Sequence, residues 1–209
     1  MTTHRPLFDA SDWMDFDAFL DLTRRAASGQ VSAAIYDDER LVSYTAANLH
    51  RMERMLRKVD LSKKLYNRLQ EVEGPWTWYV FNEPWCGDAS FALPWLRVME
   101  LASGGRIELR ILQRDTHLDL MDRYLTNGGR SIAKLVCFAG EQELGTWGPR
   151  PDILQQLVRD CMDNGVSMDE KIKLVHSWYQ KDAGDAMQRE FIALTRQWTT
   201  DERPHAHDQ

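Results

Sequence analysis

Apolar residues in the first third of the chain recur every three to four positions, which is the spacing of amphipathic helices. The pattern predicts three helices, over residues 13–27, 37–59 and 61–72. Gly74-Pro75 then interrupts the pattern, as glycine and proline do at segment boundaries. We therefore expect residues 1–73 to form an N-terminal helical extension that begins with a loose leader over residues 1–12.

After residue 74 the pattern changes to strands alternating with helices. Strands are predicted over residues 76–81, 106–112, 132–138 and 142–147. Helices are predicted over residues 89–101, 118–125 and 151–161. A strand–helix–strand–helix unit followed by a hairpin and a helix predicts a three-layer α/β arrangement with a mixed sheet. We expect this core to span residues 74–162, and residues 163–209 to add one or two helices, within 168–198, and a frayed tail over 203–209.

Composition narrows the class of protein. A chain of 209 residues that is 43% hydrophobic buries a real core, and we expect a single domain with decorations. A net charge of -6 argues against a nucleic-acid surface, and no apolar run approaches the roughly 18 residues needed to span a bilayer. The first 15 residues lack the basic-then-apolar pattern of a signal peptide. These observations predict a cytoplasmic protein that binds neither nucleic acid nor membrane, and they leave its oligomeric state open.

Three cysteines, Cys86, Cys137 and Cys161, are widely spaced and lack the pairing of a zinc site. The histidine spacing does not indicate a metal site either, so we expect no metal and no cofactor. In a reducing compartment all three cysteines should remain thiols. Cys137, in a predicted central strand, and Cys161, near a helix end, are expected to be structural.

The segment with candidate chemistry is residues 85–89, Trp-Cys-Gly-Asp-Ala, between a predicted strand and a predicted helix. Free backbone N–H groups and the helix dipole at this position favour a Cys86 thiolate, whereas an ionised Asp88 disfavours it by a comparable amount. The direction of the pKa shift therefore stays open. Asp88 is either a general base for Cys86 or an ordinary acidic residue of the first helical turn, and Trp85 flanks the thiol.

The chain resembles the thioredoxin superfamily over roughly residues 74–162. Four features carry the resemblance in order: Trp85-Cys86-Gly87, Pro94, Arg130-Ser131-Ile132-Ala133 and Gly140-Glu141. More narrowly, the residue 85–89 loop together with Thr146-Trp147-Gly148-Pro149-Arg150-Pro151 is similar to a bacterial thioredoxin-like family of little-known function. The resemblance implies a thioredoxin-like fold with extra helices at both termini.

The departures from the thioredoxin pattern bear on activity. Ala89 stands in place of the second cysteine, so intramolecular disulfide exchange cannot be completed at this loop. Val80 stands in place of the buried acid, and Ala133 replaces the cis-proline. Because a cis bond before a non-proline residue costs roughly 3–4 kcal/mol, we predict a trans Ile132–Ala133 peptide or a shifted loop.

Several arginines are candidate anion contacts. Arg114 and Arg130 are expected near the sheet end that carries Cys86, where they either contact a carboxylate of a partner or pair with Asp115 and Asp122. Arg150 either recognises an anion near a helix start or belongs to a rigid turn. In the N-terminal extension, by contrast, the basic residues are expected to form a solvated face: Arg51, Arg54, Arg57 and Lys58.

Two functions remain open at this stage. In the first, Cys86 is a single nucleophile that forms mixed disulfides with a protein or small thiol and is resolved by an external thiol. In the second, the fold is a non-catalytic binding module whose docking surface surrounds Trp85, Ile132 and Trp147, with Ala133 presenting backbone to the bound chain. A glutathione-linked enzyme is disfavoured because the C-terminal helices are too short for a transferase domain. Exposure of Cys86 beside a groove favours the first function, and burial under the added helices favours the second.

Overall fold

The computed structural model describes residues 12–31 and 39–199. The predicted leader, apart from Asp12, and the predicted tail lie outside these residues. Within them, no helix is both long enough and apolar enough to cross a membrane.

Three helices precede the sheet, as the periodicity predicts. They are α1 (Phe16–Ala27), α2 (Glu39–Leu56) and α3 (Lys63–Gln70). Asp15 and Ser62 start α1 and α3 by accepting hydrogen bonds from backbone N–H groups of the first turn, which would otherwise lack partners. Helix α1 packs on α2, and α2 packs on the first helix of the core.

The sheet has the order β2-β1-β3-β4 and is mixed, as predicted. Strand β1 (Trp76–Asn82) runs parallel to β2 (Ile107–Gln113) and antiparallel to β3 (Lys134–Ala139). Strand β4 (Gln142–Trp147) forms a hairpin with β3. The central strand β1 is buried at six of its seven positions, which explains why its sequence is apolar or aromatic up to Asn82 except at the half-buried Thr77.

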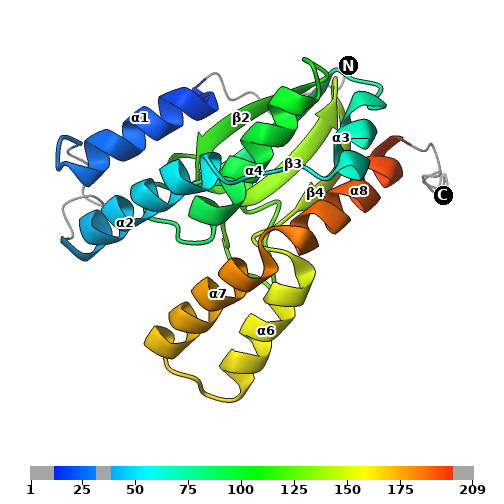
Figure 1. Ribbon diagram of the computed structural model, residues 1–209. Helices are drawn as coiled ribbons and strands as arrows, with labels where there is room; N and C mark the ends of the chain where they lie inside the picture. Colours follow the sequence, from blue (N-terminus) through cyan, green and yellow to red (C-terminus); the bar gives the residue numbers. More distant parts are fainter. Residues whose placement is uncertain (1–11, 32–38, 200–209) are drawn as a thin grey trace, which may run out of the picture.

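The remaining helices are α4 (Ala89–Ala102), the 3-10 turn η1 (Arg114–Thr116), α5 (Leu118–Met121), α6 (Asp152–Asp163), α7 (Met168–Asp182) and α8 (Asp185–Thr199). Of these, α4 and α8 lie against the sheet (Figure 1). Helix α8 covers part of the sheet, since Phe191 lies 5.3 Å from Trp78 and Trp198 lies 6.0 Å from Trp76 between ring centroids. Helix α5 is shorter than predicted, because Asn127 and Gly128 turn the chain with positive φ and the preceding residues form a non-helical turn. The fold is α/β and thioredoxin-like, with helices added before and after the core.

Helices α6 and α7 form a hairpin that projects from the body of the molecule (Figure 1). All residues of α7 are described, and none of them is fully buried. The hairpin nevertheless reaches the start of α4, because Tyr179 of α7 stacks on Phe91 of α4 at 4.2 Å between ring centroids. The C-terminal extension therefore lies against the loop that holds Cys86.

The Ile132–Ala133 peptide is cis, so the predicted trans geometry is wrong. Ala133 is fully buried, and the Ile132 carbonyl accepts a hydrogen bond from the Cys86 thiol. On the other side, the Ala133 carbonyl lies so close to Gly148 that a Cβ there would meet it at 2.3 Å. Tertiary contacts thus hold this peptide on both sides, whereas the prediction considered only its local preference.

Candidate functional site

Cys86 lies in the turn between β1 and α4. Its backbone N–H donates to the Glu83 carbonyl at 3.0 Å, and its Sγ donates to the Ile132 carbonyl at 3.2 Å. Only 7% of the residue is exposed. The thiol is therefore covered and hydrogen-bonded to the segment that replaces the cis-proline loop of thioredoxins.

Burial controls the ionisation of this thiol. Burial first, and the negative charge of Asp88 second, raise the pKa of Cys86 to about 12. The backbone N–H groups of Ala89 and Asp88 and the charge of Arg150 lower the pKa, but they do not offset the burial. Cys86 is thus a protonated thiol at neutral pH. The sequence left the direction of the shift open, and the tertiary structure decides it.

Asp88 is not available as a base for Cys86. Its Oδ2 forms an ion pair with Nη2 of Arg150 at 2.5 Å, and its Oδ1 accepts from the Tyr179 hydroxyl at 3.1 Å. Its side chain is 12% exposed and makes no capping hydrogen bond at the start of α4. Arg150 also donates to Gln155 at 2.8 Å. Asp88 therefore joins three segments of the fold: the thiol loop, the segment between β4 and α6, and helix α7.

Helix α7 supplies the cover over this loop. The ring centroids of His176 and Phe91 lie 5.6 Å apart. His176 also lies close to Gly87, because a side chain added there would place its Cβ 3.9 Å from the His176 Nε2. Burial and the charge of Arg51 lower the pKa of His176. No motif in the sequence identifies His176 or Tyr179 as part of the site. Their aromatic neighbourhood, which includes Trp178, is the only signal that they pack against something.

Helix α2 contributes a cation to the same region. Nη1 of Arg51 donates to Oγ of Ser90 at 2.8 Å and to Oδ1 of Asn48 at 2.7 Å. Its guanidinium carbon lies 4.9 Å from the centroid of Phe91. Arg51 is therefore directed toward α4, and its predicted place on a solvated basic face is wrong. A helical pattern assigns a residue to a face but does not say which neighbour covers that face.

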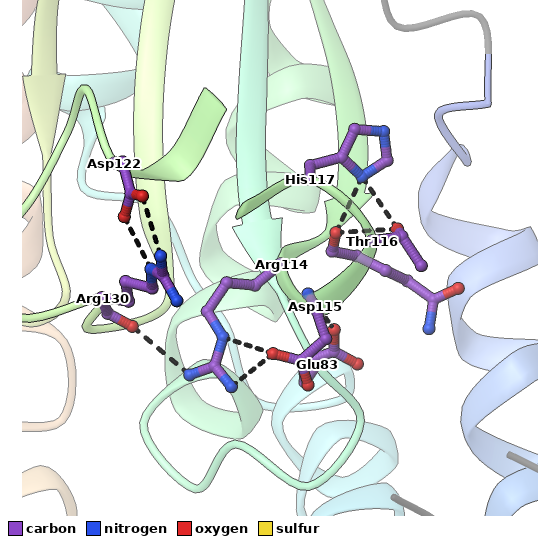
Figure 2. A network of polar contacts seen from close by, with 8 residues as sticks. Glu83, Arg114, Asp115, Thr116, His117, Asp122 and Arg130 are labelled. Carbon is purple, nitrogen blue, oxygen red and sulfur yellow. Dashed lines mark hydrogen bonds and ion pairs between the residues drawn. The ribbon is translucent and has the colours of Figure 1, made fainter. Parts of the chain in front are cut away.

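Arg114 and Arg130 belong to an ion-paired network, which is one of the two alternatives that the sequence allows (Figure 2). Arg114 donates through Nε and Nη2 to Oδ1 of Asp115 at 2.8 and 2.6 Å, and through Nη1 to the Arg130 carbonyl at 3.3 Å. Arg130 pairs with both carboxylate oxygens of Asp122. The buried Glu83 lies beside this network and accepts a hydrogen bond from the Asp115 N–H at 2.9 Å.

The three residues predicted to surround a docking surface do not lie together on an exposed one. Trp147 is 5% exposed, donates through Nε1 to Glu190 at 2.7 Å and lies 5.3 Å from the Phe191 ring. Ile132 is buried as well. Trp85 is half-buried, with the Arg114 guanidinium carbon 4.9 Å from its ring centroid. Only Trp85 therefore remains partly accessible beside the loop.

All three cysteines lie in the described residues, and all three are free and buried. Burial raises the pKa of Cys137 above its usual value. Within residues 12–31 and 39–199, no group of three or more histidine, cysteine or acidic side chains could hold a metal ion. The site therefore consists of one covered thiol, the Asp88–Arg150 ion pair beside it and the ion pairs of Arg114 and Arg130.

Comparisons with known proteins agree with this fold. The profile of a family described as thioredoxin matches residues 34–171, a longer stretch than the residues on which the sequence resemblance rests. A crystal structure of a protein of unknown function from Pseudomonas aeruginosa is similar, with a TM-score of 0.59 and 20% identity over 94% of this chain and 98% of that protein. An HIV epitope scaffold is similar with a TM-score of 0.54 and 16% identity, over 88% of this chain and 98% of that one. No curated protein matches. At these identities, the two structures show the fold alone.

Proposed function

The chain belongs to a thioredoxin family, and we propose that it is a non-catalytic binding protein in which Cys86 is a structural thiol. One observation carries the proposal: the Cys86 thiol is covered, and its pKa is raised to about 12. A nucleophilic cysteine needs a thiolate that a substrate can reach, and such cysteines lie in partly exposed, electropositive surroundings. Cys86 meets neither condition in this arrangement.

The groups that would assist exchange are absent or occupied. Ala89 stands where a resolving cysteine would lie, and Cys137 and Cys161 are buried elsewhere. Val80, fully buried, stands where thioredoxins carry a proton-accepting acid. Asp88 is engaged by Arg150 and Tyr179. The residues that remain in the loop support packing better than they support disulfide chemistry.

For the partner, we propose an acidic segment of a cytoplasmic protein that binds at the edge formed by Trp85, Arg114 and Arg130. The Arg130 side chain is 44% exposed and the Asp122 carboxylate that pairs with it is 45% exposed, so a partner carboxylate can compete for the guanidinium. Exposed ion pairs contribute little to stability, and exchanging one costs little. The half-buried Trp85 beside them offers an aromatic contact of the kind that is enriched at interfaces.

Monothiol exchange is a second candidate, because side-chain contacts of His176 and Tyr179, and no fully buried residue, hold α7 over the loop. If α7 swings away, the N–H groups of Ala89 and Asp88 and the Arg150 charge, which already act to lower the thiol pKa, face a solvated sulfur. The Cys86 thiolate then attacks one sulfur of a partner disulfide and forms a mixed disulfide, while the other sulfur leaves as a thiolate. An external thiolate then attacks the partner's sulfur in this mixed disulfide. Cys86 leaves as a thiolate, and the external thiol ends in a disulfide with the partner.

The rate of Cys86 alkylation by iodoacetamide, followed from neutral to alkaline pH on the full chain, separates the two candidates. Cys86→Ser is the control that isolates this thiol from Cys137 and Cys161. A thiol with a pKa near 12 has roughly 3,000-fold less thiolate at neutral pH than one with a pKa near 8.5, so the expected rate is lower by about that factor. Alkylation at neutral pH as fast as that of a free thiol contradicts the binding proposal, and a mixed disulfide formed with oxidised glutathione then supports monothiol exchange.

A further inference from the structure

A second polar site lies away from Cys86, under the segment that joins α5 to β3. A cavity of about 360 Å³ opens there, lined by Arg123, Tyr124, Leu125, Lys134, Glu143 and Thr146. The cavity is large enough for a small organic molecule, and its lining is mostly polar. None of these residues takes part in the contacts described for the thiol loop, so the site does not depend on whether Cys86 reacts.

Lys134 is the unusual member of this set. It is the first residue of β3, and only 8% of it is exposed. Its Nζ lies 3.5 Å from Oγ1 of Thr126 and 3.4 Å from the Gly148 carbonyl, both longer than an ordinary N–H···O hydrogen bond. Among the described residues, no carboxylate pairs with it, and burial is the only resolved influence on its pKa, which it lowers.

A buried cation without a counter-ion is costly for the fold. An ammonium group has three donors, and the two long contacts leave at least one of them directed to neither oxygen. By comparison, the covered Arg150 pairs with Asp88, and the half-buried Arg51 makes two short hydrogen bonds, at 2.7 and 2.8 Å. The missing counter-ion of Lys134 is therefore the observation that requires an explanation.

The charged residues of the lining set the charge of a ligand: Arg123 and Lys134 are cations and Glu143 is a carboxylate, and together they fit a ligand with one negative charge. Glu143 is exposed at the rim, where its Oε2 accepts from the Tyr124 hydroxyl at 2.8 Å. This carboxylate disfavours a ligand with two negative charges, but it can accept a hydrogen bond from a hydroxyl or ammonium group. The half-buried Thr146 adds a hydroxyl that can donate to an anion.

We propose that this cavity binds a small organic carboxylate, with Lys134 as the fixed cation that receives the carboxylate and Glu143 as the acceptor for a hydroxyl or amino group on the same molecule. The sequence does not point to this site, although a lysine within a strand that otherwise reads Leu-Val-Cys-Phe-Ala is its one visible signal.

The test measures saturable thermal stabilisation of the full chain by sodium acetate, glycolate, glycinate and phosphate, with sodium chloride holding the ionic strength constant. The two bifunctional probes, glycolate and glycinate, should stabilise the protein more than acetate. Lys134→Met should weaken this binding about tenfold or more, because a hydrogen bond from a charged donor is lost. Removing a buried unpaired charge should not lower stability in the absence of ligand, so this variant is expected to fold.

Two further variants complete the experiment. Lys64→Met removes an exposed lysine on α3 and should leave binding unchanged. Thr146→Val keeps the shape of the side chain, removes its hydroxyl and should weaken binding by several-fold. The proposal is overturned if no carboxylate stabilises the protein saturably, if Lys134→Met binds as tightly as the unaltered chain, or if phosphate binds more tightly than every carboxylate.

Discussion

Replacing Asp88 with asparagine removes the charge that most directly opposes ionisation of Cys86. Burial is the largest cause of the raised thiol pKa, and the charge of Asp88 is the second. For two charges ~6 Å apart at an effective dielectric near 20, the repulsion is roughly 2–3 kcal/mol. Its loss should increase the thiolate population about a hundredfold. The thiol should still ionise less readily than a free cysteine, because burial remains.

The same substitution breaks a covered ion pair. The side chains of Asp88 and Arg150 are 12% and 17% exposed, and removing one partner of a buried pair costs roughly 3–5 kcal/mol. We expect a loss of stability near the lower value, because Arg150 keeps its hydrogen bond to Gln155. Urea denaturation measures this loss, and the rate of Cys86 alkylation at a fixed alkaline pH measures the change in thiolate population.

Arg150→Met is the matched control, because it breaks the same pair but leaves the Asp88 charge beside the thiol. It should destabilise the protein by a similar amount and should not increase the thiolate population, since the lost guanidinium lowers the thiol pKa. The electrostatic reasoning is refuted if both variants speed alkylation equally, because the common effect would then be opening of the cover.

Two further predictions concern the packing that positions the site. Phe191→Ala should lower the free energy of unfolding by roughly 3–5 kcal/mol, because it leaves a cavity between Trp78 and Trp147, and calorimetry together with tryptophan fluorescence will detect this loss. A comparable loss from Leu174→Ala, at an exposed position of α7, would argue against this explanation. Gly148→Ala should lower the melting temperature far more than Gly140→Ala. Both positions have positive φ, but only at Gly148 would the added Cβ lie 2.3 Å from a carbonyl oxygen, that of Ala133. Equal losses would mean that the backbone angle alone sets the cost.

Most secondary structure could be predicted from the sequence, because the relevant signals are local. The alternation of residues 106–112 predicts β2, and the apolar spacing after residue 88 predicts α4, each within one residue of its observed ends. The apolar pattern predicts one helix over residues 118–125, but only Leu118–Met121 is helical. There the loop chemistry of Asn127 and Gly128 outweighs a short apolar pattern.

The candidate site was predicted only in part. The sequence located Cys86, Asp88 and the paired Arg114 and Arg130 at the same end of the sheet. It did not indicate that His176 and Tyr179, about ninety residues later, cover the loop, because the docking of one helix on another leaves no local motif. The helical pattern also placed Arg51 on a solvent-exposed face, and it did not indicate that Lys134 is a buried cation without a counter-ion among the described residues.

The sequence by itself determined the α/β order of the elements, the thiol at the start of α4 and the absence of a second cysteine at Ala89, because these depend on residue identity and on local periodicity. Only the tertiary structure decided whether the thiol ionises. The raised pKa of Cys86 comes from burial and from the position of Asp88, and the cis peptide at Ile132–Ala133 lies between contacts from distant segments. Desolvation and long-range packing depend on which segments meet in space, and a local pattern does not carry that information.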